Sequence, residues 1–268
     1  MELGGRVAVV TGGASGIGRA MCRAFAERGA RAVVVSDVNG AGAEEVAKGI
    51  EADGGQALSV RTDVARERDI VALVRQAEEQ CGPIDLFCSN AGIVVPGGAE
   101  APDEEWQRIW SVNLMSHVYA ARAVLPAMLA RGEGYLLHTA SAAGLLTQLG
   151  SAPYAVTKHA VVALAEWLAI THGDAGVKVS CLCPQAVRTN LLGGERPAGA
   201  RVAASPVTRD GILEPEDVAA AVVAGLADER FLILPHPEVA TYERRRADDR
   251  DRWLRGMRRV QAQITAAT

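Results

Sequence analysis

The alternation of short apolar runs with longer helical patterns constrains the fold of this chain more than any other feature. Runs that are apolar on both faces and separated by helices are typical of a parallel sheet covered on both sides. The sequence therefore predicts an α/β fold with a doubly wound parallel sheet of about seven strands. The strands are expected at residues 6–10, 32–36, 56–61, 84–89, 135–140, 177–183 and 231–234.

The helical patterns lie between these strands, and one of them contains a proline. The helices are expected at residues 17–28, 42–52, 66–80, 103–131, 154–171 and 215–228. Pro126 should kink or interrupt the long region, because proline removes a backbone N–H and clashes with the preceding turn. No long linker or internal repeat divides the chain, so we expect a single domain over residues 1–268.

Two segments go beyond this alternating pattern. Residues 185–213 are irregular and rich in Gly, Pro and Ala. A loop of that length inside a compact domain is usually a lid or a binding loop, so we expect a substrate loop there. Residues 236–268 form an expected C-terminal helical extension that the sheet does not need. This extension is expected to cap either the substrate pocket or a neighbouring subunit.

The charge balance excludes several kinds of partner. The net charge is −4, which argues against nucleic-acid binding by a general basic field. The segment 236–268 carries eight arginines against five acidic residues. A membrane or nucleic-acid patch is one interpretation, but alternating Arg and Asp favour a solvated or subunit-contacting helix. The longest uncharged stretch, 134–157, is broken by Gly, Pro, Gln and Ser, so no membrane span is expected.

The cysteines and histidines indicate the compartment and argue against a metal site. Five cysteines are an odd number with no framework spacing, which is typical of a reducing cytoplasm. The chain starts directly with an expected strand and no signal peptide, so a cytoplasmic location is expected. No His/Cys cluster has metal-ligand spacing, and we expect no metal.

A glycine-rich turn follows the first expected strand and opens the first helix. It reads Thr-Gly-Gly-Ala-Ser-Gly-Ile-Gly from Thr11 to Gly18. Glycine lets the backbone approach a pyrophosphate closely, and the exposed N–H groups of the helix N-terminus stabilise its negative charge. The residues of this turn that we expect at a cofactor are Gly12, Ser15, Gly16, Ile17 and Gly18.

Asp37 indicates which cofactor this turn would hold. It ends the second expected strand, nineteen residues after Gly18, where a carboxylate can accept hydrogen bonds from a ribose diol. The alternative is that Asp37 caps the next helix. A carboxylate would repel the 2′-phosphate of NADP, and neither Ser15 nor Val38 supplies a compensating cation. The expected cofactor is therefore NAD.

Tyr154 and Lys158 form the clearest candidate for catalysis. They stand four residues apart in an expected helix and so share a face. A nearby ammonium favours the phenolate and lowers the pKa of the phenol, which turns a tyrosine into a general acid/base. The alternative is an accidental pair, which is disfavoured because the chain has only three lysines and four tyrosines.

With these residues in place, the chain resembles the short-chain dehydrogenase/reductase family up to about residue 234. The resemblance implies a Rossmann-type domain and a short NAD-dependent oxidoreductase. The matching motifs are the turn from Thr11 to Gly18, Asp63-Val64, Asn90-Ala91-Gly92, Asn113, Ser141, Tyr154-x-x-x-Lys158 and Pro184…Thr189.

The resemblance also implies a role for each matching residue. Tyr154 would exchange a proton with the substrate oxygen while a hydride moves to or from nicotinamide, and Ser141 would orient that oxygen. Lys158 would lower the pKa of the tyrosine and bind the nicotinamide ribose, and Asn113 would hold a water that links Lys158 to solvent. The residues expected along the rest of the cofactor are Asp63, Val64, Asn90, Val187 and Thr189.

Two of these assignments have plain structural alternatives. Asn113 could instead be a helix polar group bonded to backbone, and Ser141 could be an ordinary hydroxyl at a strand end. The chain also departs from the family at Gln185, where a glycine usually follows the proline. Gln185 either projects an amide into the substrate pocket or fits a rearranged turn.

The expected substrate pocket is mainly apolar, with two polar side chains. This lining favours a hydrophobic secondary alcohol or its ketone over a sugar or an acidic metabolite. The rival interpretations are a catalytically idle NAD-binding sensor and a reductase of carrier-bound 3-ketoacyl groups. The expected pocket residues are Val94, Leu146, Gln148, Gln185 and Leu191.

The small residues of one expected helix bear on assembly. Ala155, Ala160, Ala163, Ala165 and Ala169 follow Pro153 and allow close helix packing. Relatives use this helix and the one at 104–130 to form tetramers. We therefore expect a homotetramer or a homodimer, with a small-molecule substrate as the other partner.

Overall fold

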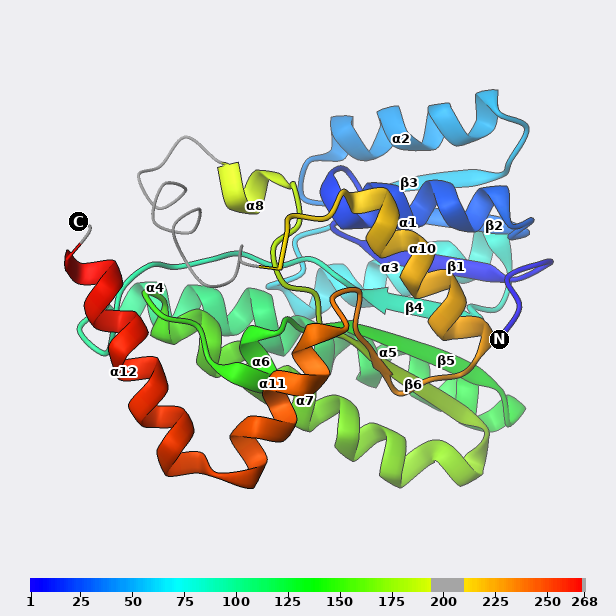
Figure 1. Ribbon diagram of the computed structural model, residues 1–268. Helices are drawn as coiled ribbons and strands as arrows, with labels where there is room; N and C mark the ends of the chain where they lie inside the picture. The colour runs from blue at the N-terminus through cyan, green and yellow to red at the C-terminus, as the bar shows by residue number, and fades with distance from the viewer. Residues whose placement is uncertain (194–209, 267–268) are drawn as a thin grey trace.

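The strands of the sequence prediction assemble into one parallel sheet. The computed structural model describes residues 1–193 and 210–266. Its strands are β1 (Val7–Thr11), β2 (Ala32–Asp37), β3 (Ala57–Arg61), β4 (Leu86–Ser89), β5 (Gly134–Thr139), β6 (Val177–Leu182) and β7 (Leu232–Ile233). Their order is β3-β2-β1-β4-β5-β6-β7, and each neighbouring pair is parallel (Figure 1). The predicted doubly wound sheet is confirmed.

Helices cover both faces of this sheet (Figure 1). They are α1 (Gly16–Glu27), α2 (Gly40–Ala52), α3 (Glu67–Cys81), α4 (Asp103–Trp110), α5 (Ser116–Arg131), α6 (Ala143–Leu146), α7 (Ala152–His172), α8 (Asn190–Gly193), α10 (Pro215–Ala227), α11 (Glu238–Asp248) and α12 (Arg250–Ala266). The core of one face joins the sheet to α1, α2 and α10. The core of the other face joins it to α3, α5 and α7.

The apolar patterns explain this two-sided burial. Residues 32–36 of β2 are all buried, as expected for a strand with helices above and below it. In α1, Met21, Cys22 and Phe25 are buried on one side at helical spacing. In α7 the buried side likewise includes Val161 and Ala165. Each helix therefore presents one apolar stripe to the sheet.

The long helical region is interrupted, but not at the proline. Pro126 lies inside α5, which continues to Arg131. Val124 and Met128 on either side of it are buried, and this packing offsets the hydrogen bond that proline cannot make. The interruption is a π-helical turn at Ser111–Met115, between α4 and α5. Wide turns of this kind often occur at functional sites, and Asn113 lies in this one.

The C-terminal extension is helical, as predicted, and it packs against the rest of the molecule. Helices α11 and α12 form it, and α11 contacts α6 (Figure 1). Val239 is fully buried and Trp253 packs against the core. The ring of His236, at the start of the extension, accepts a hydrogen bond from the backbone N–H of Gln185 at 3.2 Å. The extension is thereby joined to the end of β6.

The expected substrate loop is described only at its two ends. Val187 pairs with Leu213 in a short parallel bridge, and α8 follows at residues 190–193. Most of the loop predicted at 185–213 lies outside the described residues.

Within the described residues, no helix combines the length and the apolar character needed to cross a bilayer. All five cysteines are free thiols, in agreement with the absence of a disulfide framework.

Candidate functional site

The glycine-rich turn after β1 has the geometry of a cradle for an anionic ligand. Gly12 and Gly16 have positive φ values of 68° and 50°, which glycine adopts without strain. A Cβ on Gly18 would lie 2.0 Å from the carbonyl oxygen of Gly12, so this position accepts only glycine. Ser15 is the N-cap of α1 but its side chain makes no capping hydrogen bond. The helix N-terminus and the Ser15 hydroxyl remain available to a phosphate.

Asn90 joins this turn to the neighbouring strand at the point where the strand order reverses. Its side-chain Nδ2 donates to the carbonyl oxygen of Thr11 at 3.0 Å. The backbone N–H groups of Asn90 and Ala91 donate to the Thr11 hydroxyl at 2.9 and 3.2 Å. Ligands of doubly wound proteins bind in the crevice at such a reversal. These bonds fix the floor of that crevice between β1 and β4.

The carboxylate of Asp37 lies beside the glycine turn. One oxygen accepts a hydrogen bond from the backbone of Ala14 at 3.0 Å, and the other accepts from the backbone of Asn39 at 2.9 Å. The N-cap of α2 is Asn39, whose side chain accepts from Gly42. The alternative that Asp37 caps this helix is therefore wrong. Its carboxylate is placed where the carboxyl end of β2 meets the turn.

The other residues expected along a cofactor lie at the same edge of the sheet. Asp63 follows β3 and pairs with Arg66 at 3.0 Å, while Val64 is buried in the core. Thr189 lies against the glycine turn. A Cβ atom added to Gly16 would come within 2.9 Å of the methyl group of Thr189. Val187 is buried and bridges to Leu213. The first three parallel strands thus place Asp37, Asp63 and the glycine turn in one row.

Ser141 and Tyr154 are brought together by two different elements. Ser141 follows β5, and its hydroxyl accepts from the backbone of Ala143 at 3.1 Å and donates to the carbonyl of Pro184 at 3.4 Å. Tyr154 lies in the first turn of α7. Burial raises the pKa of Tyr154, and its hydrogen bond with Ser141 acts in the opposite direction. The tyrosine hydroxyl is therefore a proton donor at neutral pH in the free protein.

Lys158 is buried one helical turn beyond Tyr154. Its Nζ donates to the carbonyl oxygen of Thr139 at 2.8 Å and lies 5.7 Å from the centre of the Tyr154 ring. Only 3% of the lysine is exposed, and this burial lowers the pKa of its ammonium to about 8. The shared helix face predicted for the two residues agrees with this geometry.

Close packing under Lys158 fixes where α7 lies. A Cβ on Gly144 of α6 would lie 2.6 Å from the carbonyl oxygen of Lys158. Only glycine therefore lets α6 approach α7 this closely. The hydroxyl of Thr157 donates back to the carbonyl of Pro153 at 2.9 Å, inside the same helix. The lysine and the tyrosine are held by a rigid element.

Asn113 is fully buried in the π-helical turn and binds the backbone that follows β4. Its Oδ1 accepts from the N–H of Ile93 at 2.8 Å, and its Nδ2 donates to the carbonyl of Ile93 at 2.9 Å. A Cβ on Gly92 would lie 3.4 Å from Asn113 Oδ1 and 3.5 Å from Lys158 Nζ. Asn113 thus bonds to backbone, as in the alternative that makes it a helix polar group. The backbone it binds is that of Ile93 in the segment after β4, close to Lys158.

Two buried histidines near Lys158 escaped the sequence reasoning. His117 of α5 and His138 of β5 are at most 1% exposed, and their Nδ1 atoms lie 2.9 Å apart. Their rings are stacked. Burial lowers the pKa of both imidazoles, to about 4 for His138, and Lys158 lowers that of His117 further. Twenty-one residues separate them, so no sequence motif could have revealed this pair.

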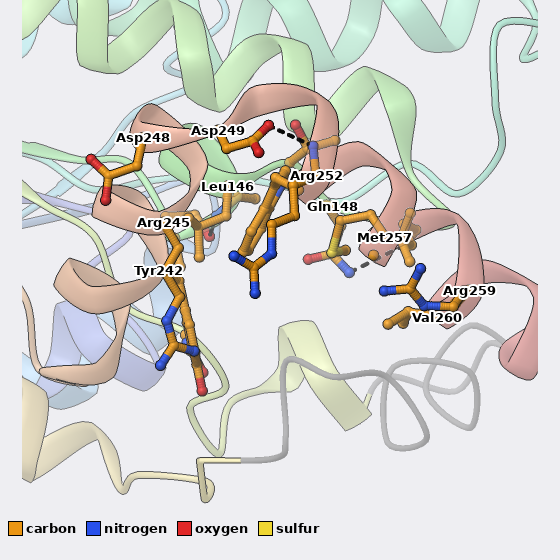
Figure 2. Close-up of a pocket in the computed structure, with 18 residues that line it drawn as sticks. Leu146, Gln148, Tyr242, Arg245, Asp248, Asp249, Arg252, Met257, Arg259 and Val260 are labelled. Carbon is orange, nitrogen blue, oxygen red and sulfur yellow. Dashed lines mark hydrogen bonds between the residues drawn. The ribbon is translucent and has the colours of Figure 1, made fainter.

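A cavity of about 820 Å³ begins at Ser141 and extends beneath the C-terminal extension. Of the expected pocket residues, Leu146, Gln148 and Gln185 line it, whereas Val94 and Leu191 do not. Leu191 is instead exposed on α8. Figure 2 shows that α11 and α12 supply a large part of the wall, with side chains directed into it. Their contribution includes Tyr242, Arg245, Arg252, Trp253, Met257, Arg259 and Val260.

The extension thus forms a wall of the pocket, which is one of the two roles expected for it. Gln185 also lines the cavity, and among the described residues its buried Oε1 has no hydrogen-bond partner. Among the residues that the structure describes, no three His, Cys, Asp or Glu side chains are grouped so that they could hold a metal ion.

Comparisons with known proteins identify similar dehydrogenases. The chain is 38% identical to 1-deoxy-11-beta-hydroxypentalenate dehydrogenase from Streptomyces exfoliatus over 93% of this chain and 90% of the relative. It is also 38% identical to cis-4-hydroxycyclohexanecarboxylate dehydrogenase from Sinomonas cyclohexanicum, over 85% of this chain and 92% of the relative.

A solved structure resembles the whole molecule. It is a short chain dehydrogenase/reductase from Burkholderia phymatum in complex with NAD, 32% identical, with a TM-score of 0.86. The match covers 94% of this chain and 96% of that one. The family model described as short chain dehydrogenase matches residues 6–199. The glycine turn, the Ser141–Tyr154–Lys158 group and these matches together show that the chain belongs to the short-chain dehydrogenase/reductase family.

Proposed function

We propose that this oxidoreductase interconverts a secondary alcohol and its ketone with NAD, on a hydrophobic substrate. The observation that carries the proposal is the meeting of Tyr154 and Lys158 with Ser141, which lines a large cavity and follows β5 at the same sheet edge as the glycine turn. The two relatives named above are called dehydrogenases of hydroxylated carboxylates, which supports a hydroxyl group as the site of reaction.

The residues present fit a dinucleotide. The positive φ values of Gly12 and Gly16 shape the turn, and a phosphate would bind the backbone N–H groups at the N-terminus of α1. The Asp37 carboxylate would accept hydrogen bonds from a ribose diol, and its charge would repel a 2′-phosphate. When bound, the nicotinamide would supply the acceptor or donor of the hydride.

In this proposal three side chains handle the proton and the substrate oxygen. The Ser141 hydroxyl orients the oxygen by a hydrogen bond. Tyr154 gives its proton to that oxygen during ketone reduction and takes it back during alcohol oxidation. The ammonium of Lys158 lies 5.7 Å from the tyrosine ring, in a site with little water, and favours the phenolate that this exchange requires.

The pocket supports a hydrophobic substrate body. Ala142, Ala143, Leu146 and Leu149 line the cavity near Ser141. A volume of about 820 Å³ lies within the usual range for small-molecule sites, roughly 300–1,000 Å³. The partnerless Oε1 of Gln185 would accept a hydrogen bond from the substrate, because a buried acceptor without a partner is costly.

The rival functions have less support. A sensor that only binds NAD needs no buried lysine beside a tyrosine, and burying that ammonium lowers its pKa to about 8 and costs stability. A reductase of carrier-bound groups would need a basic surface for an acidic carrier and usually NADP, which Asp37 disfavours.

We extend the proposal to assembly as a homodimer or homotetramer. Helices α4 and α7 expose several large apolar side chains, which are Trp110, Val156, Trp167 and Ile170. Ile170 is 84% exposed. Exposed apolar groups concentrated on two helices are typical of a protein–protein interface.

Replacing Tyr154 by phenylalanine tests the proposed chemistry. We expect kcat for alcohol oxidation to fall by about 10²–10⁴-fold, the usual contribution of a general acid/base. The dissociation constant for NAD should stay within about threefold, because the ring remains. Tyr119→Phe on α5 is the matched control and should be active. Retention of activity in Tyr154→Phe would refute the role given to this hydroxyl.

Cofactor preference tests the role of Asp37. The wild type should have a higher kcat/KM with NAD than with NADP. In Asp37→Asn the side chain can still accept from Ala14, but the charge is lost, so we expect discrimination against NADP to relax by about tenfold or more. Asp53→Asn, at the far end of α2, should change nothing. A wild-type preference for NADP would overturn the assignment.

Replacing Lys158 by methionine tests how much the buried ammonium lowers the free energy of unfolding. Lysine titrates near 10.5 when unfolded and near 8 in the folded protein, so at pH 7 the buried charge destabilises the fold by about 3 kcal/mol. Lys158→Met should therefore be inactive but more stable to urea.

The pH dependence of this difference has a defined sign. Between pH 8 and 10.5 the unfolded chain binds the extra proton, so wild-type stability rises with pH and the advantage of Lys158→Met shrinks. Lys48→Met, at an exposed site, should show no such trend. If Lys158→Met were less stable than the wild type at pH 7, the buried ammonium would not be destabilising the fold as argued.

Light scattering at micromolar concentration tests the assembly. The wild type should have the mass of a dimer or a tetramer. Ile170→Asp would place a charge in the proposed interface and should shift the mass towards the monomer. Val71→Asp, on exposed α3, should not. A monomeric wild type would be decisive against this proposal.

A further inference from the structure

Three arginines of the C-terminal extension line the same cavity as Ser141. They are Arg245 of α11 and Arg252 and Arg259 of α12. The three stand seven residues apart in the sequence, and Figure 2 shows their guanidinium groups on the cavity side of the two helices, with Arg252 between the others. The wall contributed by the extension therefore carries a row of positive charge.

The guanidinium groups of these arginines are unpaired as far as the described residues show. Within residues 1–193 and 210–266, no hydrogen bond or ion pair of the three guanidinium groups is found, whereas other arginines such as Arg188 and Arg122 pair with glutamates. All three are solvent-exposed. Guanidinium donors without protein partners can bind a ligand without first breaking an internal ion pair.

Two carboxylates also line the cavity, against three guanidinium groups. Asp249 accepts a hydrogen bond from the backbone N–H of Arg252 at 2.8 Å, so it caps the start of α12. Figure 2 shows the carboxylate of Asp248 directed away from the three guanidinium groups. The cavity therefore carries a net positive charge on its outer wall.

Apolar side chains share this cavity with the arginines and Ser141. Leu146 and Leu149 come from the segment around α6, and Trp253, Met257 and Val260 come from α12. Trp253 packs against the core, so the helix that carries Arg252 is anchored. A ligand that fills the cavity would contact these apolar side chains as well as Ser141 and the guanidinium groups.

We propose that Arg252, flanked by Arg245 and Arg259, binds a carboxylate of the substrate. This inference rests on the proposed function, since it takes the reacting hydroxyl to lie at Ser141 and Tyr154. The substrate class is then a hydrophobic secondary alcohol that carries a carboxylate on the far side of its apolar body. Arginine suits this role, because its planar donors match a carboxylate with two parallel hydrogen bonds.

This substrate class differs from the sequence-based expectation, which disfavoured acidic compounds. The expected lining near Ser141 is apolar, as the structure confirms at Leu146. The arginines come from a segment of alternating charges that is typical of a solvated helix. Only the packing of α11 and α12 over the cavity gives these charges a ligand-facing position.

The first test measures binding without turnover. Cyclohexanecarboxylate has no hydroxyl to oxidise, and cyclohexanecarboxamide is its neutral counterpart. Calorimetry on the full-length protein, with and without NAD, should show at least tenfold tighter binding of the carboxylate, with an affinity that falls as salt is added. Arg252→Gln should reduce carboxylate affinity about tenfold and leave carboxamide binding unchanged.

A matched control separates this site from general charge. Arg255→Gln removes the same charge from α12, but Arg255 lies on a neighbouring hollow and not on the cavity with Ser141. It should bind cyclohexanecarboxylate like the wild type. Equal loss in Arg255→Gln and Arg252→Gln, or equal binding of carboxylate and carboxamide by the wild type, would overturn the proposal.

The second test links the site to catalysis. Cyclohexanecarboxylate should inhibit oxidation of the neutral alcohol cyclohexanol competitively. Its inhibition constant should rise about tenfold in Arg252→Gln and stay at the wild-type value in Arg255→Gln. If cyclohexanol is oxidised but the carboxylate binds no better than the amide, the anion site fails and the proposed function stands. If no alcohol is oxidised but the binding preference is present, the proposed function fails and the anion site stands.

Discussion

The parallel direction of all seven strands places every strand-to-helix turn at one edge of the sheet. The chain leaves this edge after each strand, so residues scattered over most of its length converge there. Asn90 and Ala91, just after β4, donate three hydrogen bonds to Thr11 at the end of β1 and so fix the point where the strand order reverses. The candidate site groups at the ends of the first six strands are the glycine turn, Asp37, Asp63, Asn90, Ser141 and Gln185.

Beneath this edge the protein buries ionisable groups that do not favour folding. Lys158 has one backbone acceptor, at Thr139, and burial lowers the pKa of its ammonium. His117 and His138 share a hydrogen bond, but within the part of the chain that the structure describes, the buried Nε2 atoms of both rings have no hydrogen-bond partner. A core with apolar groups at these positions would be more stable. The polar cluster is instead concentrated where the proposed chemistry needs a charge with little water around it.

The site combines a part built on the sheet edge and α7 with a part built on the C-terminal extension. The glycine turn, Ser141, Tyr154 and Lys158 lie on the sheet edge and on α7, and short contacts such as that at Gly144 hold them rigidly. The outer wall of the cavity comes from α11 and α12, joined to the sheet through His236 and Gln185. The rigid part would perform the chemistry, and the added helices would select the substrate.

Local sequence determined the elements and the motif residues, because apolar periodicity and glycine spacing act over a few residues. The strands, the shared helix face of Tyr154 and Lys158, and the position of Asp37 could all be read in this way. Long-range packing decided the rest. It kept α5 continuous through Pro126, paired His117 with His138, and laid Arg252 over the cavity, because each of these depends on segments that are distant in sequence.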